Sequence, residues 1–318
     1  MKNTIFLSLL SILVLTACGL ETDLKKQTAN NIARPAFMVE RTVQAGMFNL
    51  QAWERMHTRN TVATLYIEGD SIHEINTRAP YIASNLPGIN PTPAMPLGLY
   101  LASRDKSSNL AYLARPCQYI KSPEEKGCAI SYWHERRFTP EVVAAYESAL
   151  DDIAARYDIT GFHIVGYDGG ANIAAVLAAK RTDILSLRTV AGNLNPDFTI
   201  DKTNHKLLAS DSVLAVDYAT LLANVPQHHF IGAADSYITP GVYHSYRQMV
   251  GLSDCISYSL VQDADHTHGW VEKWPGLLDI KPQCALVHDT LPALPSAKIP
   301  MDFPSSNDSK SSTVKYSK

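Results

Sequence analysis

A five-residue turn, Gly-Tyr-Asp-Gly-Gly at residues 166–170, constrains the fold of this chain more than any other feature. It lies between the apolar run 162–165, which is typical of a strand, and the alanine-rich run 171–180, which is typical of a helix. The turn has the form Gly-x-Ser-x-Gly, with Asp168 in the place of the serine. Such a turn holds its central residue in a strained conformation and needs glycine on both sides, because its neighbours pack closely. The sequence therefore predicts a strand that turns sharply into a helix at Asp168.

The rest of the chain alternates between strand-like and helix-like segments. Strands separated by helical stretches favour an α/β fold, with a mostly parallel sheet covered by helices on both faces in a single domain. A helix from 140 to 156 has Thr139 as its expected N-cap and Pro140 at its first position. The other predicted helices are 171–180 and 269–278, and the predicted strands are 62–67, 110–114, 162–165, 187–190, 229–231 and 256–260.

The two ends of the chain differ in composition from this middle part. Residues 18–45 are mixed and polar, and we expect them to form a tether, followed by the folded domain at 46–285. Residues 286–318 are rich in proline and serine, which predicts a disordered tail.

Residues 1–17 have the pattern of a secretory signal. Lys2 supplies the positive charge, residues 5–15 form the apolar stretch, and Leu15-Thr16-Ala17-Cys18 is a small-residue cleavage site. The apolar stretch is too short for a transmembrane anchor. The cysteine makes the segment resemble a bacterial lipobox, which implies that Cys18 is the lipidated (palmitate-bearing) first residue of the mature protein. Gly19 in the next position resembles the outer-membrane sorting case, so we expect a lipid-anchored protein of the bacterial envelope that faces the periplasm.

The net charge and the composition limit the classes of molecule that this protein is expected to bind. The net charge of −3 and the absence of a basic block argue against nucleic-acid binding. A chain that is 46% hydrophobic and 19% charged is an ordinary globular protein. We expect a small-molecule substrate or ligand, a membrane contact through the lipid, and no cofactor.

Four cysteines remain in an exported domain, where disulfides persist. Cys117 and Cys128 flank a polar loop, which favours a local bridge and leaves Cys255 and Cys284 as the second pair. Four cysteines permit three pairings, and the sequence does not choose among them. Zinc is less favoured, because the cysteine and histidine spacings fit no metal pattern.

Two further strand ends carry residues that suit catalysis. Asp235 follows the apolar run 230–231, and His266 follows the strand at 256–260, with His268 as a rival two residues away. The order Asp168, Asp235, His266 is nucleophile, acid, histidine, with each residue at the carboxyl end of a strand, where open α/β sheets place their ligands.

At this point the chain resembles a bacterial α/β-hydrolase family of envelope proteins, over most of residues 62–280. The resemblance is carried by the elbow and by five other segments. These segments are residues 66–70, 112–119, 188–194, 226–230 and the final histidine with Trp270-x-x-x-Trp274. The chain departs from the family at Asp168, where serine is usual, and at Ser71, where glycine is expected.

The resemblance implies a role for each matching residue. Asp168 is the nucleophile, Asp235 orients the histidine, and His266, in preference to His268, is the base. The segment Glu68-Gly69-Asp70 follows an early strand, where this fold builds its oxyanion loop. Backbone N–H groups of Gly69 or Asp70, together with that of Gly169, are the expected oxyanion donors, and a plain polar turn is the alternative for Glu68 and Asp70.

Other polar residues have structural interpretations. We expect His163 to be a core residue, residues 133–137 to form a polar turn, and Arg115 to make a structural ion pair. His228 and His229 are adjacent in a strand, so they point to opposite faces and cannot chelate one ion.

Aspartate at the elbow changes the chemistry. Attack by a carboxylate on an ester would form an anhydride, so ester hydrolysis through Asp168 is disfavoured. A carboxylate is suited to saturated carbon, through an alkyl ester that activated water opens. Haloalkane dehalogenases and epoxide hydrolases, which share the fold, act in this way, although tryptophan typically follows their aspartate and Gly169 follows it here. Two hypotheses remain: a hydrolase with an Asp-Asp-His site, or a silent pseudo-hydrolase that binds a ligand or protein partner.

Overall fold

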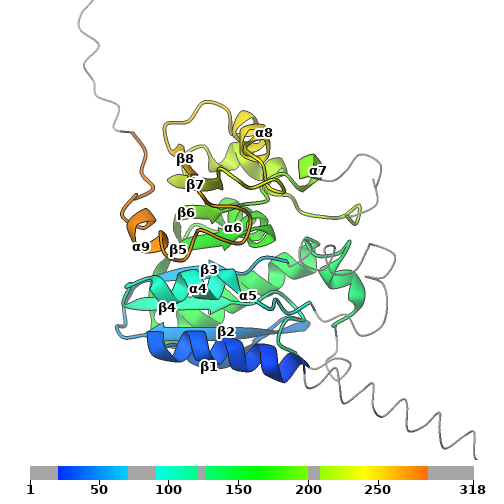
Figure 1. The fold of residues 1–318 in the computed structure, drawn as a ribbon, viewed down its shortest axis with the longest axis vertical. Coiled ribbons are helices and arrows are strands. Elements are labelled where there is room, and N and C mark those ends of the chain that lie inside the picture. The colour runs from blue at the N-terminus through cyan, green and yellow to red at the C-terminus, as the bar shows by residue number, and fades with distance from the viewer. Residues whose placement is uncertain (1–20, 71–90, 121–126, 200–207, 286–318) are drawn as a thin grey trace, which may run out of the picture. The chain divides into compact units, whose positions relative to one another are not determined.

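The computed structural model describes residues 21–70, 91–120, 127–199 and 208–285. Within them, eight strands form one sheet in the order β1-β2-β4-β3-β5-β6-β7-β8, and Figure 1 shows them in this order from the bottom of the view to the top. β2 is antiparallel to both of its neighbours, and every other adjacent pair is parallel. The strands are β1 (Val39–Ala45), β2 (Phe48–Met56), β3 (Thr61–Ile67), β4 (Asn109–Leu113), β5 (Ile159–Tyr167), β6 (Ile184–Val190), β7 (Gln227–Gly232) and β8 (Ile256–Val261).

Two apolar clusters lie on opposite faces of this sheet. Alternate residues of a strand point to opposite faces, so Leu65 of β3 belongs to one cluster and Tyr66 to the other. The first cluster contains residues of α5, α6, α8 and η3, and the second contains residues of the helix at 21–33, of α4 and of α9. Helices therefore cover both faces, and the predicted α/β class is confirmed. The helices are η1 (Arg34–Ala36), α4 (Leu97–Arg104), η2 (Ile130–Trp133), α5 (Pro140–Tyr157), α6 (Gly169–Lys180), α7 (Pro196–Thr199), η3 (Ala215–Leu222), α8 (Pro240–Val250) and α9 (Trp274–Leu277).

The N-terminal part of the domain corrects the expected boundary. Residues 21–33 form a helix and residues 39–45 form β1, so they are part of the fold and not a tether. Ala29 and Ala33 are fully buried, and the indole N–H of Trp53 donates to Asn30. Most residues of this segment are polar, and its apolar face is a narrow stripe that includes Ala29 and Ala33. Such a stripe is enough to pack a helix against a sheet.

The C-terminal helix is shorter than predicted. The sequence pattern predicts a helix from 269 to 278, whereas α9 spans Trp274–Leu277 alone. Gly269 has a φ of +81°, a conformation outside the helical region, and the residues after it form turns. Trp270 and Trp274 are both fully buried, so the apolar spacing reflects packing against the sheet.

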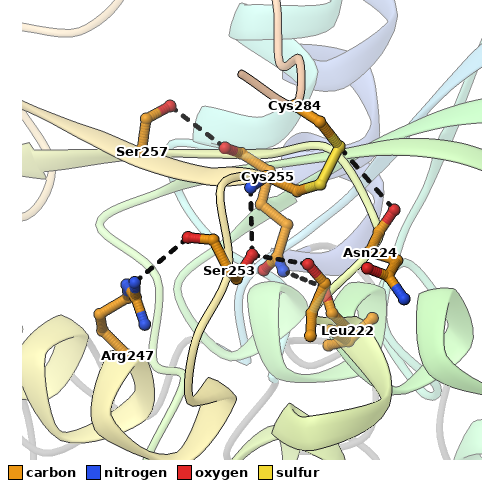
Figure 2. Close-up of a disulfide and its surroundings, with 9 residues drawn as sticks. Leu222, Asn224, Arg247, Ser253, Cys255, Ser257 and Cys284 are labelled. Atoms are coloured by element: carbon orange, nitrogen blue, oxygen red, sulfur yellow. Dashed lines mark hydrogen bonds between the residues drawn. A yellow bond between two sulfur atoms is a disulfide. The ribbon is translucent and has the colours of Figure 1, made fainter. Parts of the chain in front are cut away.

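Two disulfides are present. Cys117 is bonded to Cys128, and Cys255 is bonded to Cys284. Figure 2 shows the second, which joins the start of the edge strand β8 to the end of the described chain. The N–H of Ala285 donates to the carbonyl of Asp254 beside it, so this disulfide fixes the last described residues against the sheet edge.

Some expectations lie outside the described residues: the signal at 1–17, the lipidation site Cys18, Ser71, and the tail at 286–318. No helix within the described ranges is long and apolar enough to cross a bilayer.

Candidate active site

The elbow between β5 and α6 holds Asp168 in a strained conformation. Its φ is 47° and its ψ is −122°, a region that costs a residue with a side chain about 1–3 kcal/mol. The surrounding backbone holds the turn in place: the N–H of Asp168 donates to the carbonyl of Val190, and its carbonyl accepts from the N–H groups of Ala171 and Asn193. The strained residue is therefore held by hydrogen bonds to the first turn of α6 and to the segment at the end of β6.

Close packing explains the glycines of the elbow. A Cβ on Gly166 would overlap the backbone of Ala171, and one on Gly170 would overlap the carbonyl oxygens of Ile67 and Glu68. The end of β3 and the start of α6 are thus in direct backbone contact. This contact places the residues that follow β3 beside Asp168.

Asp235 and His266 lie on the loops that follow β7 and β8. One carboxylate oxygen of Asp235 accepts from the N–H groups of Tyr237 and Ile238, both at 2.8 Å, which fixes its orientation. Its other oxygen hydrogen-bonds to Nδ1 of His266 at 3.1 Å. Nε2 of His266 then lies 3.7 Å from Oδ1 of Asp168. The structure thus brings the three predicted catalytic residues together in the order Asp235, His266, Asp168.

The two candidate histidines differ sharply in position. The His266 side chain is 7% exposed and faces Asp168 and Asp235, whereas that of His268 is 83% exposed and pairs with Asp265. His268 therefore has no contact with the elbow, and His266 is the residue that can act there.

Burial dominates the electrostatics of this site. Loss of solvation, followed by the negative charge of Asp70, raises the pKa of Asp168 from 3.8 to about 8. Burial alone would lower the pKa of His266, but its hydrogen bond to Asp235 and the charge of Asp168 raise the pKa above 6.5. Burial thus favours the neutral form of the elbow carboxyl.

Asp70 lies where the oxyanion loop was expected, and its carboxylate occupies that place. It is 2% exposed, its Oδ2 accepts from Nε of Arg137 at 3.0 Å, and a Cβ on Gly169 would overlap this oxygen. The N–H of Gly69 donates to Oε1 of Glu68, so it is not directed at a ligand. The backbone N–H of Gly169 lowers the pKa of the Asp168 carboxyl, so it lies on the side of the elbow residue. The predicted oxyanion residues are therefore adjacent to Asp168, but the N–H of Gly69 is already taken by Glu68.

Glu68 has a structural position. Its carboxylate accepts from the N–H of Gly98, in the first turn of α4, and from the hydroxyl of Tyr112. Burial is the largest influence and raises its pKa from 4.5 to about 7. Glu68 thus links the end of β3 to α4.

Sequence reasoning missed Arg137. Residues 133–137 were interpreted as a polar turn, but Arg137 is 3% exposed and directs its guanidinium at Asp70. Arg115 makes no ion pair in the described part of the chain: its guanidinium donates to the carbonyl of Arg137 and stacks over Phe138. The sequence does show two arginines, Arg136 and Arg137, just before the helix that begins at Pro140. Nothing in the neighbouring residues indicates that Arg137 pairs with Asp70.

Three other histidines, all in strands, have partners in the sheet. His163 hydrogen-bonds to Ser186, His229 to Thr189, and His228 to Ser257 and Ser259. Within the described ranges, no three His, Cys, Asp or Glu side chains are grouped so as to hold a metal ion.

Comparisons with known proteins identify the fold. An α/β serine hydrolase homologue from Coxiella burnetii matches with a TM-score of 0.51 and 12% identity, over 76% of this chain and 95% of that one. An esterase from Pyrococcus furiosus matches with a TM-score of 0.53 and 10% identity, over 77% of this chain and 91% of that one. No family model matches the chain, and no curated protein does. The sheet order, the elbow and these two likenesses together show that the chain has the α/β-hydrolase fold.

Proposed function

We propose that this protein is a hydrolase in which Asp168 attacks a saturated carbon atom of a small molecule. The observation that carries the proposal is the position of His266, which hydrogen-bonds to Asp235 at 3.1 Å and lies 3.7 Å from the elbow carboxyl. An oriented histidine beside a strained elbow residue is the arrangement that nucleophilic catalysis requires.

The first step forms an ester on Asp168. An oxygen of the ionised carboxylate makes a bond to the saturated carbon, and the bond from that carbon to the leaving group breaks. The leaving group departs with the electron pair of the broken bond. A halide leaves as the free ion, whereas the ring oxygen of an epoxide leaves as an alkoxide that takes a proton from water. No oxyanion forms on the Asp168 carboxyl in this step, so the carboxylate of Asp70 beside Gly169 does not oppose attack on a haloalkane.

The second step opens this ester. His266 takes a proton from a water molecule whose oxygen adds to the carboxyl carbon of Asp168, and Asp235 stabilises the imidazolium that forms. Collapse expels the alcohol product, which receives the proton from His266, and restores the carboxyl group.

Hydrolysis of external esters fits the site less well. Such a reaction needs donors directed at the substrate oxygen, whereas the N–H of Gly69 donates to Glu68 and the carboxylate of Asp70 lies against Gly169. The substrate class that agrees with these contacts is an alkyl electrophile, such as a haloalkane or an epoxide.

A panel of electrophiles tests the proposal. We would measure hydrolysis of 1-bromobutane, 1,2-epoxyhexane and styrene oxide at pH 9 by the native chain and by Asp168→Asn and His266→Gln. Both variants should lose turnover. His268→Gln is the matched control, since it changes an exposed histidine two residues away, and it should retain native activity. Absence of turnover by the native chain on the whole panel would contradict the proposal.

One observation favours a second candidate, a silent protein that binds a ligand or protein partner. The carboxyl of Asp168 is mostly protonated at neutral pH, because its pKa is raised to about 8, and a neutral carboxyl is a poor nucleophile. Under this hypothesis the panel shows no turnover at any pH.

We further propose that the mature protein begins at Cys18 and is held in the bacterial envelope, on the periplasmic side of the outer membrane, by lipid on that residue. The lipobox-like pattern before Cys18 supports this proposal. Detergent phase partitioning of the native chain and of Cys18→Ser tests it: the native protein should enter the detergent phase and the variant should stay in the aqueous phase.

A further inference from the structure

The carboxyl groups of Asp70 and Asp168 form a buried pair. Both residues are 2% exposed, and the backbone at Gly69 and Gly169 brings their carboxyl groups beside each other. The residues that follow β3 and β5 pack closely around this pair. A Cβ on Gly169 would overlap Oδ2 of Asp70, and a Cβ on Gly69 would lie 3.0 Å from Oδ2 of Asp168. Two carboxyl groups this close, and away from water, do not both carry a charge readily, so one proton is retained between them.

Arg137 decides which carboxyl keeps the negative charge. Its Nε donates to Asp70 at 3.0 Å, while its NH1 group donates to the carbonyl of His134 at 2.8 Å and its guanidinium lies over the ring of Phe138, 5.0 Å from the centroid. The arginine is thus fixed on two sides and presents its charge to Asp70. Arg137 therefore stabilises negative charge on Asp70 rather than on Asp168.

Other charged and titratable groups surround Asp168. His266 approaches from the loop after β8, with Asp235 behind it, and the buried Tyr237 lies after β7 within the field of both Asp168 and Asp70. Asp168 Oδ1, which faces His266, has no hydrogen-bond partner in the described structure. Oδ2 of Asp168 lies toward Gly69, on the Asp70 side, and the oxygen without a hydrogen bond is the one that faces His266.

We propose that Asp70, held as a carboxylate by Arg137, is a positioning residue that keeps the elbow carboxyl of Asp168 in its protonated form and so controls when this nucleophile is ionised. This inference rests on the proposed function, since it assigns Asp70 a role in the ionisation of Asp168, the nucleophile of that reaction. The raised pKa of Asp168 agrees with it. As a consequence, Asp168 can act as a nucleophile only after the proton shared with Asp70 has been lost.

Titration of the Asp168 carboxyl tests the inference without any substrate. The full-length chain would be labelled with aspartate carrying carbon-13 at the carboxyl carbon, and the resonance that disappears in Asp168→Asn would be assigned to Asp168. In the native protein this resonance should titrate near pH 8, and in Asp70→Asn its midpoint should fall by more than one pH unit. Asp263→Asn changes an exposed carboxylate and is the matched control, with an unchanged midpoint.

A second variant protects the test against loss of folding. In Arg137→Gln the pair loses its positive neighbour, so it should hold its proton more tightly and the midpoint should rise. A merely structural contact does not produce shifts of opposite sign in these two variants. The inference is overturned if the native resonance titrates near the ordinary value of about 4, or if neither variant moves it. Since the titration needs no turnover, a failed substrate panel with the expected shifts would contradict the hydrolase proposal alone.

Discussion

Nε2 of His266 lies 3.7 Å from Oδ1 of Asp168, slightly beyond hydrogen-bond distance, although both side chains are buried. The Asp70 carboxyl lies beside the same elbow, where a Cβ on Gly169 would overlap its Oδ2. The elbow residue therefore lies between two ionisable side chains, a histidine and a second carboxyl group.

The first prediction concerns the pH profile of turnover. Attack requires ionised Asp168, whose pKa is raised to about 8, so kcat/KM for styrene oxide should increase with pH and level off above about 8. At pH 6 it should be roughly a hundredfold below the plateau, since each unit below the pKa reduces the ionised fraction about tenfold. A profile that is flat between pH 6 and 9 would show that ionisation of Asp168 does not control the reaction.

The second prediction concerns conversion to an esterase. Asp168→Ser alone should hydrolyse p-nitrophenyl acetate poorly, because the Asp70 carboxylate lies against Gly169, where an oxyanion would form. Asp168→Ser with Asp70→Gly removes that charge and leaves Arg137 nearby, so the rate should rise about a hundredfold, within the range for one oxyanion contact.

The control for this comparison is Asp168→Ser with Asp263→Gly, which removes an exposed carboxylate at a residue with a φ of 56°, a conformation that glycine adopts readily. It should behave as the single variant does. An Asp168→Ser protein as active as the double variant would show that Asp70 does not obstruct the oxyanion.

The third prediction concerns stability and Glu68. The folded-state pKa of Glu68 is about 7, above its ordinary 4.5, so the folded protein holds this proton while the unfolded chain has lost it. The free energy of unfolding should therefore fall as pH rises from about 4.5 to about 7, by up to about 3 kcal/mol from this residue.

Glu68→Gln should remove that part of the pH dependence and be relatively more stable at pH 7 than at pH 4.5. Urea unfolding at several pH values measures the effect, and Glu272→Gln, at an exposed position, is the control. An unchanged slope in Glu68→Gln would mean that another group carries the pH dependence.

The fourth prediction concerns the disulfide between Cys255 and Cys284. It closes a loop with a sequence separation of 29, so replacing both cysteines by serine should lower the free energy of unfolding by about 3.6 kcal/mol through the entropy of the unfolded chain. Thermal unfolding of the native and variant chains, with and without reductant, measures this. If reductant lowers the Tm of the serine variant as much as it lowers that of the native protein, the stabilisation comes from the disulfide between Cys117 and Cys128 instead.

The parallel half of the fold was predictable because its strands are short apolar runs with clear ends. The strand predicted at 62–67 corresponds to β3, and the run at 162–165 lies inside β5. The antiparallel strands β1 and β2 were not predicted, because residues such as Glu40, Arg41 and Glu54 interrupt their apolar pattern. In the structure Arg41 pairs with Glu54 across the two strands, so the polar residues satisfy one another.

The candidate site also contains features that the sequence predicts and features that it does not. The residues at strand ends could be placed from the order of the elements, since parallel strands end at one edge of the sheet. The choice of His266 over His268 depends on which side chain is turned inward, and the contact of Arg137 with Asp70 joins residues 67 positions apart. Neither relationship has a local pattern in the sequence.

The most direct test of the covalent route is the fate of the oxygen from water. The native chain would turn over styrene oxide at pH 9 in water enriched in oxygen-18, and the peptide containing Asp168 would be weighed by mass spectrometry. The account predicts that the Asp168 carboxyl gains the heavy oxygen, since water adds to its carbon, and that the diol from the first turnover contains only oxygen-16. An unlabelled Asp168 peptide after several turnovers would contradict nucleophilic attack by this residue.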